Sequence, residues 1–178
     1  MRQKVLILPY FVDDSDVRVI CVKNKKHNEW TFISGGKDTH ETIFETFKRE
    51  LKEETLGILD LDRIDSSLNL DISYQEFIST FIDRSERKKW DIKKEDTYST
   101  KYHIFAFNCA PLGVIENFKK DFRQRSKTFQ GSVIENKDMD VFTLQELQTK
   151  KTWYFIREVI LKNFKIIDTL KRIGCIFT

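Results

Sequence analysis

Short apolar runs separated by polar turns over the first third of the chain predict β-strands. The runs comprise residues 5–8, 17–22 and 30–33, and the polar segments 13–16 and 23–28 separate them. Aspartate, asparagine and serine favour turns because their side chains bond to the local backbone. The second and third strands are therefore expected to form a hairpin, which leads the chain into a pair of glycines, Gly35 and Gly36.

A helix is predicted after the glycines, beginning between residues 39 and 42 and ending near residue 55. Apolar side chains recur at helical spacing within it and form the stripe expected to face the core, namely Ile43, Phe44, Phe47 and Leu51.

Three glutamates of this helix stand at positions i, i+3 and i+4, so Glu50, Glu53 and Glu54 share one face, roughly opposite the apolar stripe. Like charges at this spacing repel one another. A cation among them offsets the repulsion, and hard divalent ions such as Mg²⁺ bind carboxylate and carbonyl oxygens. The pattern therefore predicts a candidate metal site on the exposed face of the helix.

The remainder of the chain mixes strand-like and helix-like patterns. Residues 56–61 are expected to form a short strand, residues 102–107 a central strand and residues 141–144 the last strand. Residues 72–82 fit either a helical stripe or a strand, and both interpretations stay open. A long C-terminal helix is predicted at about residues 152–172, where large apolar side chains repeat at steps of three and four: Trp153, Ile156, Ile160, Phe164, Ile167 and Leu170.

The composition is that of one globular domain. The chain has 178 residues, of which 40% are apolar and 33% charged, and no repeat or linker divides it. Its net charge of +3 does not by itself indicate nucleic-acid binding. The three cysteines are widely separated, no signal peptide is present, and no apolar run reaches the roughly 20 residues of a membrane span. We therefore expect a cytoplasmic protein without a membrane partner.

The segment from residue 35 to residue 58 resembles the signature box of the Nudix hydrolases. Glu41 follows Gly35 after six positions, and eight positions further Arg49 begins the core motif RELKEE. Gly57 and Ile58 close the segment. The segment departs from the usual pattern at both ends, because the loop before Glu41 is one residue shorter and one additional residue precedes Gly57.

This resemblance implies a fold, a reaction and a cofactor. The fold is expected to be a single Nudix domain over residues 1–178, an α/β/α sandwich in which a mixed curved sheet lies between the box helix and the long C-terminal helix. The reaction is hydrolysis of a diphosphate bond in a nucleotide-type substrate, with Mg²⁺ or Mn²⁺ as the cofactor. Such ions neutralise phosphate charge and lower the pKa of bound water.

The resemblance also assigns roles to the residues of the box. The expected metal ligands are Glu50, Glu53, Glu54 and the carbonyl oxygen of Gly36. Two of these glutamates, Glu53 and Glu54, are also the expected catalytic residues of the box. Structural support of the box is expected from Gly35 and from a charge pair between Glu41 and Arg49.

A further catalytic residue is expected outside the box. Many members of the family use another acidic residue from a loop before the last strand. Glu135 is the best candidate in this chain, followed by Asp138. The alternative is that both belong to an ordinary solvated loop.

Two basic segments are candidates for substrate binding. In a charged insertion at about residues 71–97, Trp90 is flanked by Lys88, Lys89, Lys93 and Lys94. Residues 117–127 interleave two phenylalanines with basic residues that include Lys119, Lys120 and Arg123. Lysine and arginine bind phosphates and aromatic rings stack on bases, so both segments suit RNA, and Lys37 beside the glycine pair is a further candidate. The alternative is that the charged runs are solvated and the phenylalanines belong to the core.

The box is also similar to that of the mRNA-decapping Nudix enzymes of poxviruses and other large DNA viruses. This similarity implies the 5′ cap of mRNA as the substrate, release of 7-methylguanosine diphosphate, and the host cytoplasm as the location of a viral protein. One alternative is a hydrolase of small molecules such as nucleotide sugars, dinucleoside polyphosphates or inositol pyrophosphates. Another is a Nudix-fold binding module without catalysis, against which the three intact glutamates argue.

Overall fold

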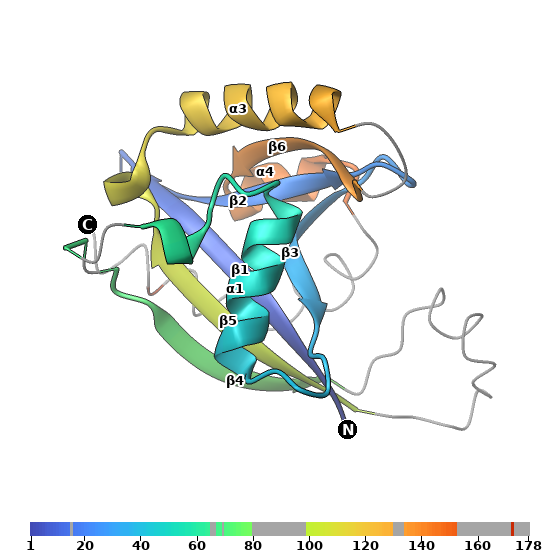
Figure 1. The fold of residues 1–178 in the computed structure, drawn as a ribbon. Coiled ribbons are helices and arrows are strands. Elements are labelled where there is room, and N and C mark those ends of the chain that lie inside the picture. The colour runs from blue at the N-terminus through green and yellow to red at the C-terminus, as the bar shows by residue number, and fades with distance from the viewer. Residues whose placement is uncertain are drawn as a thin grey trace.

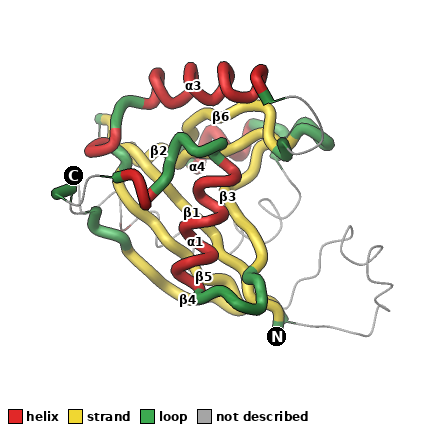
Figure 2. The backbone as a smooth tube through the Cα atoms, viewed as in Figure 1, coloured by secondary structure: helices red, strands yellow, loops and turns green. Residues whose placement is uncertain are grey.

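The chain folds around a six-stranded mixed sheet, drawn in Figure 1 and, as a tube, in Figure 2. The structure is a computed structural model that describes residues 1–14, 16–64, 67–68, 70–79, 99–129, 134–152 and 172. No helix among these residues is long and apolar enough to cross a membrane. The elements are, in chain order, β1 (Arg2–Asp13), β2 (Asp16–Asn24), β3 (Trp30–Gly36), α1 (Ile43–Glu54), η1 (Leu61–Arg63), β4 (Ser73–Ser79), β5 (Thr100–Asn108), η2 (Ala110–Leu112), α3 (Ile115–Thr128), β6 (Asn136–Phe142) and α4 (Leu144–Thr149).

β1 lies inside the sheet, whose strand order is β4-β5-β1-β3-β2-β6. It runs parallel to β5, pairs antiparallel with β3 along its first half, and pairs with β2 across the turn at its end. β2 is antiparallel to both β3 and β6, and β4 is antiparallel to β5. The three predicted N-terminal strands, the hairpin that leads into the glycine pair and the central strand at residues 102–107 are thereby confirmed.

Alternate side chains of β1 enter two separate cores, because successive residues of a strand face opposite sides of the sheet. Val5 and Ile7 pack with buried residues of α1 and α3. Leu6 and Leu8 belong to the core on the other face, which includes Leu147 of α4. α1 lies against β1 and β3, and α3 lies against β6 (Figure 1). The predicted mixed α/β class is confirmed, whereas the C-terminal helix expected at about residues 152–172 lies outside the described residues except at its two ends.

α1 begins where the sequence places the box helix, because Thr42 forms a capping box with Glu45. The Thr42 hydroxyl accepts a hydrogen bond from the Glu45 amide at 3.1 Å, and the Glu45 carboxylate accepts one from the Thr42 amide at 2.7 Å. Both donors would otherwise lack a partner within the helix. The start of the helix is therefore determined by local sequence.

The apolar stripe of α1 reaches the core at Phe47 and Leu51, which are fully buried. The prediction is wrong at Phe44, whose side chain is 48% exposed. Its ring lies at the border of the core, tilted against Phe47 and edge-on to Phe105 of β5. Helical spacing predicts the direction of a side chain but not where the covering sheet ends.

The segment after α1 is not the strand predicted for residues 56–61. Leu56 and Gly57 have φ angles of +54° and +77°, which belong to the left-handed region. The Gly57 amide donates to the Lys52 carbonyl at 2.7 Å, which closes the end of the helix. The additional residue of the box is thus accommodated by a left-handed turn, in which Leu56 carries strain that a glycine would avoid.

Two other elements differ from the sequence patterns. Within residues 72–82 the structure decides the open interpretation in favour of a strand, β4, which pairs with β5 along its whole length. The last strand, predicted at residues 141–144, is instead β6, which begins at Asn136 and ends at Phe142. It ends there because the Thr143 hydroxyl accepts a hydrogen bond from the Glu146 amide at 3.1 Å and so caps α4.

The second basic segment, residues 117–127, forms most of α3, although the sequence pattern did not predict a helix there. Phe118 and Phe122 stand four residues apart on one face of α3, and both are buried. The alternative interpretation of these two phenylalanines, that they belong to the core, is therefore confirmed. The charged residues on the other positions of the helix obscure this short apolar stripe in the sequence.

Candidate active site

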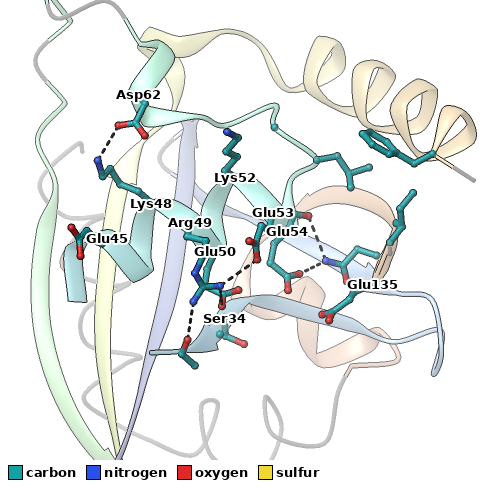
Figure 3. A pocket seen from close by; sticks show the side chains of 17 residues that line it. Ser34, Glu45, Lys48, Arg49, Glu50, Lys52, Glu53, Glu54, Asp62 and Glu135 are labelled. Carbon is teal, nitrogen blue, oxygen red and sulfur yellow. Dashed lines mark hydrogen bonds and ion pairs between the residues drawn. The ribbon is translucent and has the colours of Figure 1, made fainter. Parts of the chain in front are cut away.

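A cleft of about 1140 Å³ opens where α1, the end of β3 and the segment before β6 meet. Figure 3 shows the side chains that line it, among them the glutamates of α1 and, facing them, Glu135. α1 contributes one wall, the left-handed turn after it contributes the rim, and Phe129 and Ile134 close the cleft on the side of α3 and β6. Segments that are far apart in the sequence thus surround the acidic face of the box helix.

The glycine at position 35 is required by Glu50. A Cβ atom built on Gly35 would lie 1.9 Å from Cδ of Glu50, far inside van der Waals contact, whereas one built on Gly36 would meet nothing within 4 Å. Neither glycine has a positive φ angle. The first glycine therefore makes room for a carboxylate, and the second is not required for space.

Arg49 holds the loop after β3 against the helix. Its Nε and Nη2 atoms donate to the two carboxylate oxygens of Glu41 at 2.5 and 3.0 Å, and Nη2 also donates to the carbonyl oxygen of Gly36 at 3.0 Å. Nη1 donates to Glu50 at 2.7 Å and to Glu53 at 3.2 Å. The planar guanidinium allows this set of contacts, which an ammonium group cannot reproduce.

The same contacts set the charge state of Glu41. Hydrogen bonding to Arg49, with smaller help from Thr46 and the Asp38 amide, lowers the pKa of Glu41 to about 2. Glu41 also accepts a hydrogen bond from the Thr46 hydroxyl at 2.9 Å. This carboxylate is thus fixed in its charged form as the counterion of Arg49.

Glu54 lies in a different environment, beside Asn136 at the start of β6. The Asn136 side-chain amide donates to the Glu54 carboxylate. Burial raises the pKa of Glu54 to about 8, and the negative charges of Glu135 and Glu50 add to the effect against the hydrogen bond from Asn136. Burial also raises the pKa of Glu50, with Arg49 acting in the opposite direction. Both sites therefore disfavour a charged carboxylate in the absence of a cation.

We expect the metal-free protein to lose stability as pH rises from about 4.5 to about 8. Over this range folded Glu54, with a pKa of about 8, keeps a proton that it loses in the unfolded chain, where its pKa is the ordinary 4.5. Stability falls with pH wherever the folded state binds more protons. Thermal unfolding in EDTA across this range would measure the effect.

The control for this titration is Glu54→Gln, in which the group that binds the proton is removed. The lowered pKa of His103 acts with the opposite sign in part of the same range, so the difference between wild type and variant isolates Glu54. An unchanged pH profile in the variant would contradict the assignment.

The predicted metal ligands face the cleft but are not gathered around one point. Among the described residues, no group of three or more His, Cys, Asp or Glu side chains is arranged to hold a metal ion. Glu50 is turned toward Arg49, Glu54 toward Asn136, and Glu53 is 60% exposed. Gly36, whose carbonyl is the other predicted ligand, lines the same cleft. These assignments stay predictions.

The predicted substrate-binding residues lie elsewhere. Lys37 does not line the cleft, and its ammonium group donates to the Asp38 carbonyl at 3.2 Å. Lys119, Lys120 and Arg123 lie along α3, outside the cleft. The five candidates of the charged insertion lie outside the described residues: Lys88, Lys89, Trp90, Lys93 and Lys94. Asp138, the second acidic candidate, lies on β6 and pairs with Arg123 at 3.3 Å.

The structure adds residues that the sequence analysis did not single out. Lys48 and Lys52, one helical turn apart on α1, line the cleft together with Asn136 and Phe129. The side chain of Phe129 is 57% exposed. The sequence offers a signal for three of these residues, because Lys48 and Lys52 belong to the same predicted helix as the glutamates and Asn136 directly follows Glu135. Phe129 reaches the cleft only through the packing of α3.

No family model matches the sequence, and no curated protein matches it either. Solved structures do match. The dihydroneopterin triphosphate pyrophosphohydrolase of E. coli is 15% identical, with a TM-score of 0.55 over 97% of this chain and 94% of that one. The Ap4A hydrolase of C. elegans is 15% identical, with a TM-score of 0.52 over 99% of this chain and 98% of that one. The NUDIX domain of Shewanella oneidensis NrtR, complexed with ADP ribose, is 12% identical, with a TM-score of 0.53 over 96% of this chain and 87% of that one.

These similarities identify the fold. The chain has the Nudix fold, with a mixed sheet and helices that match those structures over nearly its whole length. Identities of 12–15% establish the fold alone, so the activity and the substrate have to be argued from the site.

Proposed function

We propose that this protein is a metal-dependent hydrolase that cleaves a diphosphate bond in a nucleotide-type substrate. The observation that carries the proposal is the group of four carboxylates at one cleft, Glu50, Glu53, Glu54 and Glu135, on a Nudix fold. None of the described lysines or arginines forms an ion pair with Glu54 or Glu135. A carboxyl in a cleft without a basic partner, with a pKa as strongly raised as that of Glu54, is typical of a functional site.

The donor set fits Mg²⁺ or Mn²⁺. Both ions prefer oxygen ligands, and the cleft offers carboxylates of Glu50, Glu53, Glu54 and the Gly36 carbonyl. Burial raises the pKa values of Glu50 and Glu54, with a smaller contribution from neighbouring carboxylates, and a cation would favour the charged form of both. When bound, such an ion would neutralise charge on the diphosphate and lower the pKa of a bound water.

The other residues of the site position these groups. Arg49 holds Glu50 and the Gly36 carbonyl on the same side of the cleft through contacts of 2.7 and 3.0 Å. Asn136 orients the carboxylate of Glu54. Glu53 and Glu135, both exposed in the cleft, are the groups able to accept a proton from an attacking water. Lys48 and Lys52, on the same helix as the three glutamates, line the cleft and supply positive charge for a phosphate.

Two substrate classes follow from different observations. The solved structures with this fold include an Ap4A hydrolase and a dihydroneopterin triphosphate pyrophosphohydrolase, which favours a small nucleotide. The box sequence and the basic residues of α3 favour capped RNA, cleaved to release 7-methylguanosine diphosphate. Both classes contain a phosphoanhydride linkage, so the same carboxylates of the cleft would serve the reaction in either case.

A substrate panel tests the proposal. The full chain would be incubated with Mg²⁺ or Mn²⁺ and with Ap4A, ADP-ribose, dihydroneopterin triphosphate or cap-labelled RNA. We expect metal-dependent cleavage of at least one diphosphate, abolished by EDTA. Cleavage of the small nucleotides alone would exclude decapping. If no substrate is cleaved and calorimetry detects no metal binding, the protein is a binding module and the proposed activity is wrong.

A further inference from the structure

α3 carries a net charge equal to that of the entire chain. Its 14 residues include five basic side chains and two acidic ones, Glu116 and Asp121, which gives +3. The whole chain also has a net charge of +3, so the remaining residues sum to zero. α3 is therefore strongly basic for a helix of 14 residues.

Three of the five basic side chains of α3 have structural partners. Arg125 donates to the carbonyl oxygen of Leu56 in the turn after α1, at 2.7 Å. Lys119 pairs with Asp140 at 3.1 Å, and Arg123 pairs with Asp138 at 3.3 Å. These contacts dock the helix on β6 and on the rim of the cleft.

Lys120 and Lys127 complete the set, and neither contacts an acidic side chain among the described residues. They lie on a shallow groove along the outer side of α3, together with Lys119 and Arg123. Lys119 and Lys127 are eight residues apart, which corresponds to about 12 Å along the helix axis. We refer to the four cations Lys119, Lys120, Arg123 and Lys127 as the basic face.

An exposed aromatic ring lies between the basic face and the cleft. α3 ends at Thr128, and the next residue, Phe129, lines the cleft with a side chain that is 57% exposed. Leu56 and Ile134 also line the cleft. An exposed aromatic ring beside apolar side chains is a surface on which a nucleobase stacks.

We propose that the basic face and Phe129 together bind single-stranded RNA whose reactive end lies in the cleft. Cations that follow a phosphate backbone, combined with an aromatic ring that stacks on a base, are the two elements of single-strand binding. The inference rests on the proposed function for the position of the reactive end.

The charge distribution favours an RNA whose reactive end lies in the cleft and whose remaining phosphates lie along α3. The cleft itself is acidic, so the part of a polyanion that is not paired with a metal is repelled there and attracted by α3. An acidic protein partner would use the same cations but would not need the aromatic ring at the cleft. RNA uses both.

The test measures binding of a short, uncapped, fluorescent single-stranded RNA to the full chain in EDTA at increasing salt. Lys120→Ala/Lys127→Ala should weaken binding and lower the slope of log K against log salt by about 1.4, because each phosphate contact on a single strand contributes about 0.7. Phe129→Ala should weaken binding by about 5-fold to 150-fold, the range for loss of one stacked base.

Matched variants exclude general effects of charge and surface. Lys26→Ala/Lys150→Ala removes two exposed charges from other sites and should keep the slope. Phe44→Ala removes a similarly exposed ring outside the cleft, 48% against 57%, and should keep the affinity. Phe129→Trp should retain binding, because a larger ring still stacks.

The outcomes separate this inference from the proposed hydrolase activity. RNA binding in EDTA that depends on Lys120, Lys127 and Phe129 supports the inference even if no nucleotide is cleaved, a result that would count against the activity alone. An unchanged salt slope in Lys120→Ala/Lys127→Ala overturns the inference even if small nucleotides are hydrolysed. Equal binding of a polyglutamate peptide, unaffected by Phe129→Ala, would also overturn it and assign the face to acidic proteins.

Discussion

Glu54→Gln is expected to reduce metal-dependent hydrolysis by about 100-fold or more while leaving the fold intact. A bound metal contributes several kcal/mol to a transition state of this kind, and each 1.4 kcal/mol corresponds to a factor of ten in rate. The variant keeps the shape of the side chain and the oxygen that accepts a hydrogen bond from Asn136. It removes only the charge that a metal would use.

Stability in the absence of metal should not fall in this variant. Burial and the neighbouring carboxylates raise the pKa of Glu54 to about 8, so near neutral pH the folded, metal-free wild type binds a proton that the unfolded chain has lost, and glutamine avoids this cost. Melting temperatures in EDTA should therefore be similar near pH 4.5 and higher for the variant near neutral pH. Addition of Mn²⁺ should raise the melting temperature of the wild type and not that of the variant, because only a ligand that binds the folded state stabilises it.

Glu45→Gln is the matched control for this change. Glu45 lies on the same helix and lines the same cleft, and glutamine at this position preserves the capping box with Thr42. Its activity should remain near that of the wild type. Near-normal turnover of Glu54→Gln, or an equal loss in Glu45→Gln, would show that Glu54 is not a metal ligand.

The second large effect is expected at Gly35, where alanine should reduce activity by about 100-fold. The new methyl group would lie 1.9 Å from Cδ of Glu50, so that carboxylate must move. The end of a flexible side chain yields more easily than the backbone, and the protein should still fold. Displacement of a catalytic group by about 1 Å is sufficient for a loss of this size.

Gly36→Ala provides the control, because a Cβ at that position meets nothing within 4 Å. We expect near-normal activity from it and unchanged circular dichroism from both glycine variants. A double variant sharpens the test, since Gly35→Ala should add little to the effect of Glu50→Gln if it acts through that carboxylate. Additive losses, or equal losses at both glycines, would contradict the mechanism.

The pattern of local sequence was a good guide where local interactions dominate. The start of α1 follows from the capping box of Thr42 and Glu45, and the strands at residues 5–8, 17–22, 30–33 and 102–107 follow from their apolar runs. It failed at residues 56–61, where Leu56 adopts a left-handed conformation that apolar composition does not reveal. It also failed at Phe44, because exposure depends on where the sheet ends beneath the helix.

α3 is a helix that the local sequence pattern did not predict. Phe118 and Phe122 carry the only strong apolar spacing within a segment rich in charge, so the helix depends on its packing against β6. Its ion pairs with Asp138 and Asp140 join residues that no local pattern relates. Tertiary contacts decide elements of this kind.

The sequence by itself determined the acidic face of the box helix, because the spacing of Glu50, Glu53 and Glu54 fixes their direction once a helix forms. Only the tertiary structure decided what that face meets. It placed Asn136 and Glu135 opposite Glu54, it showed that Gly35 is needed to make room for Glu50, and it brought Phe129 to the rim. The physical reason is that a charge acquires its pKa and its partners from groups distant along the chain, and packing alone brings those groups together.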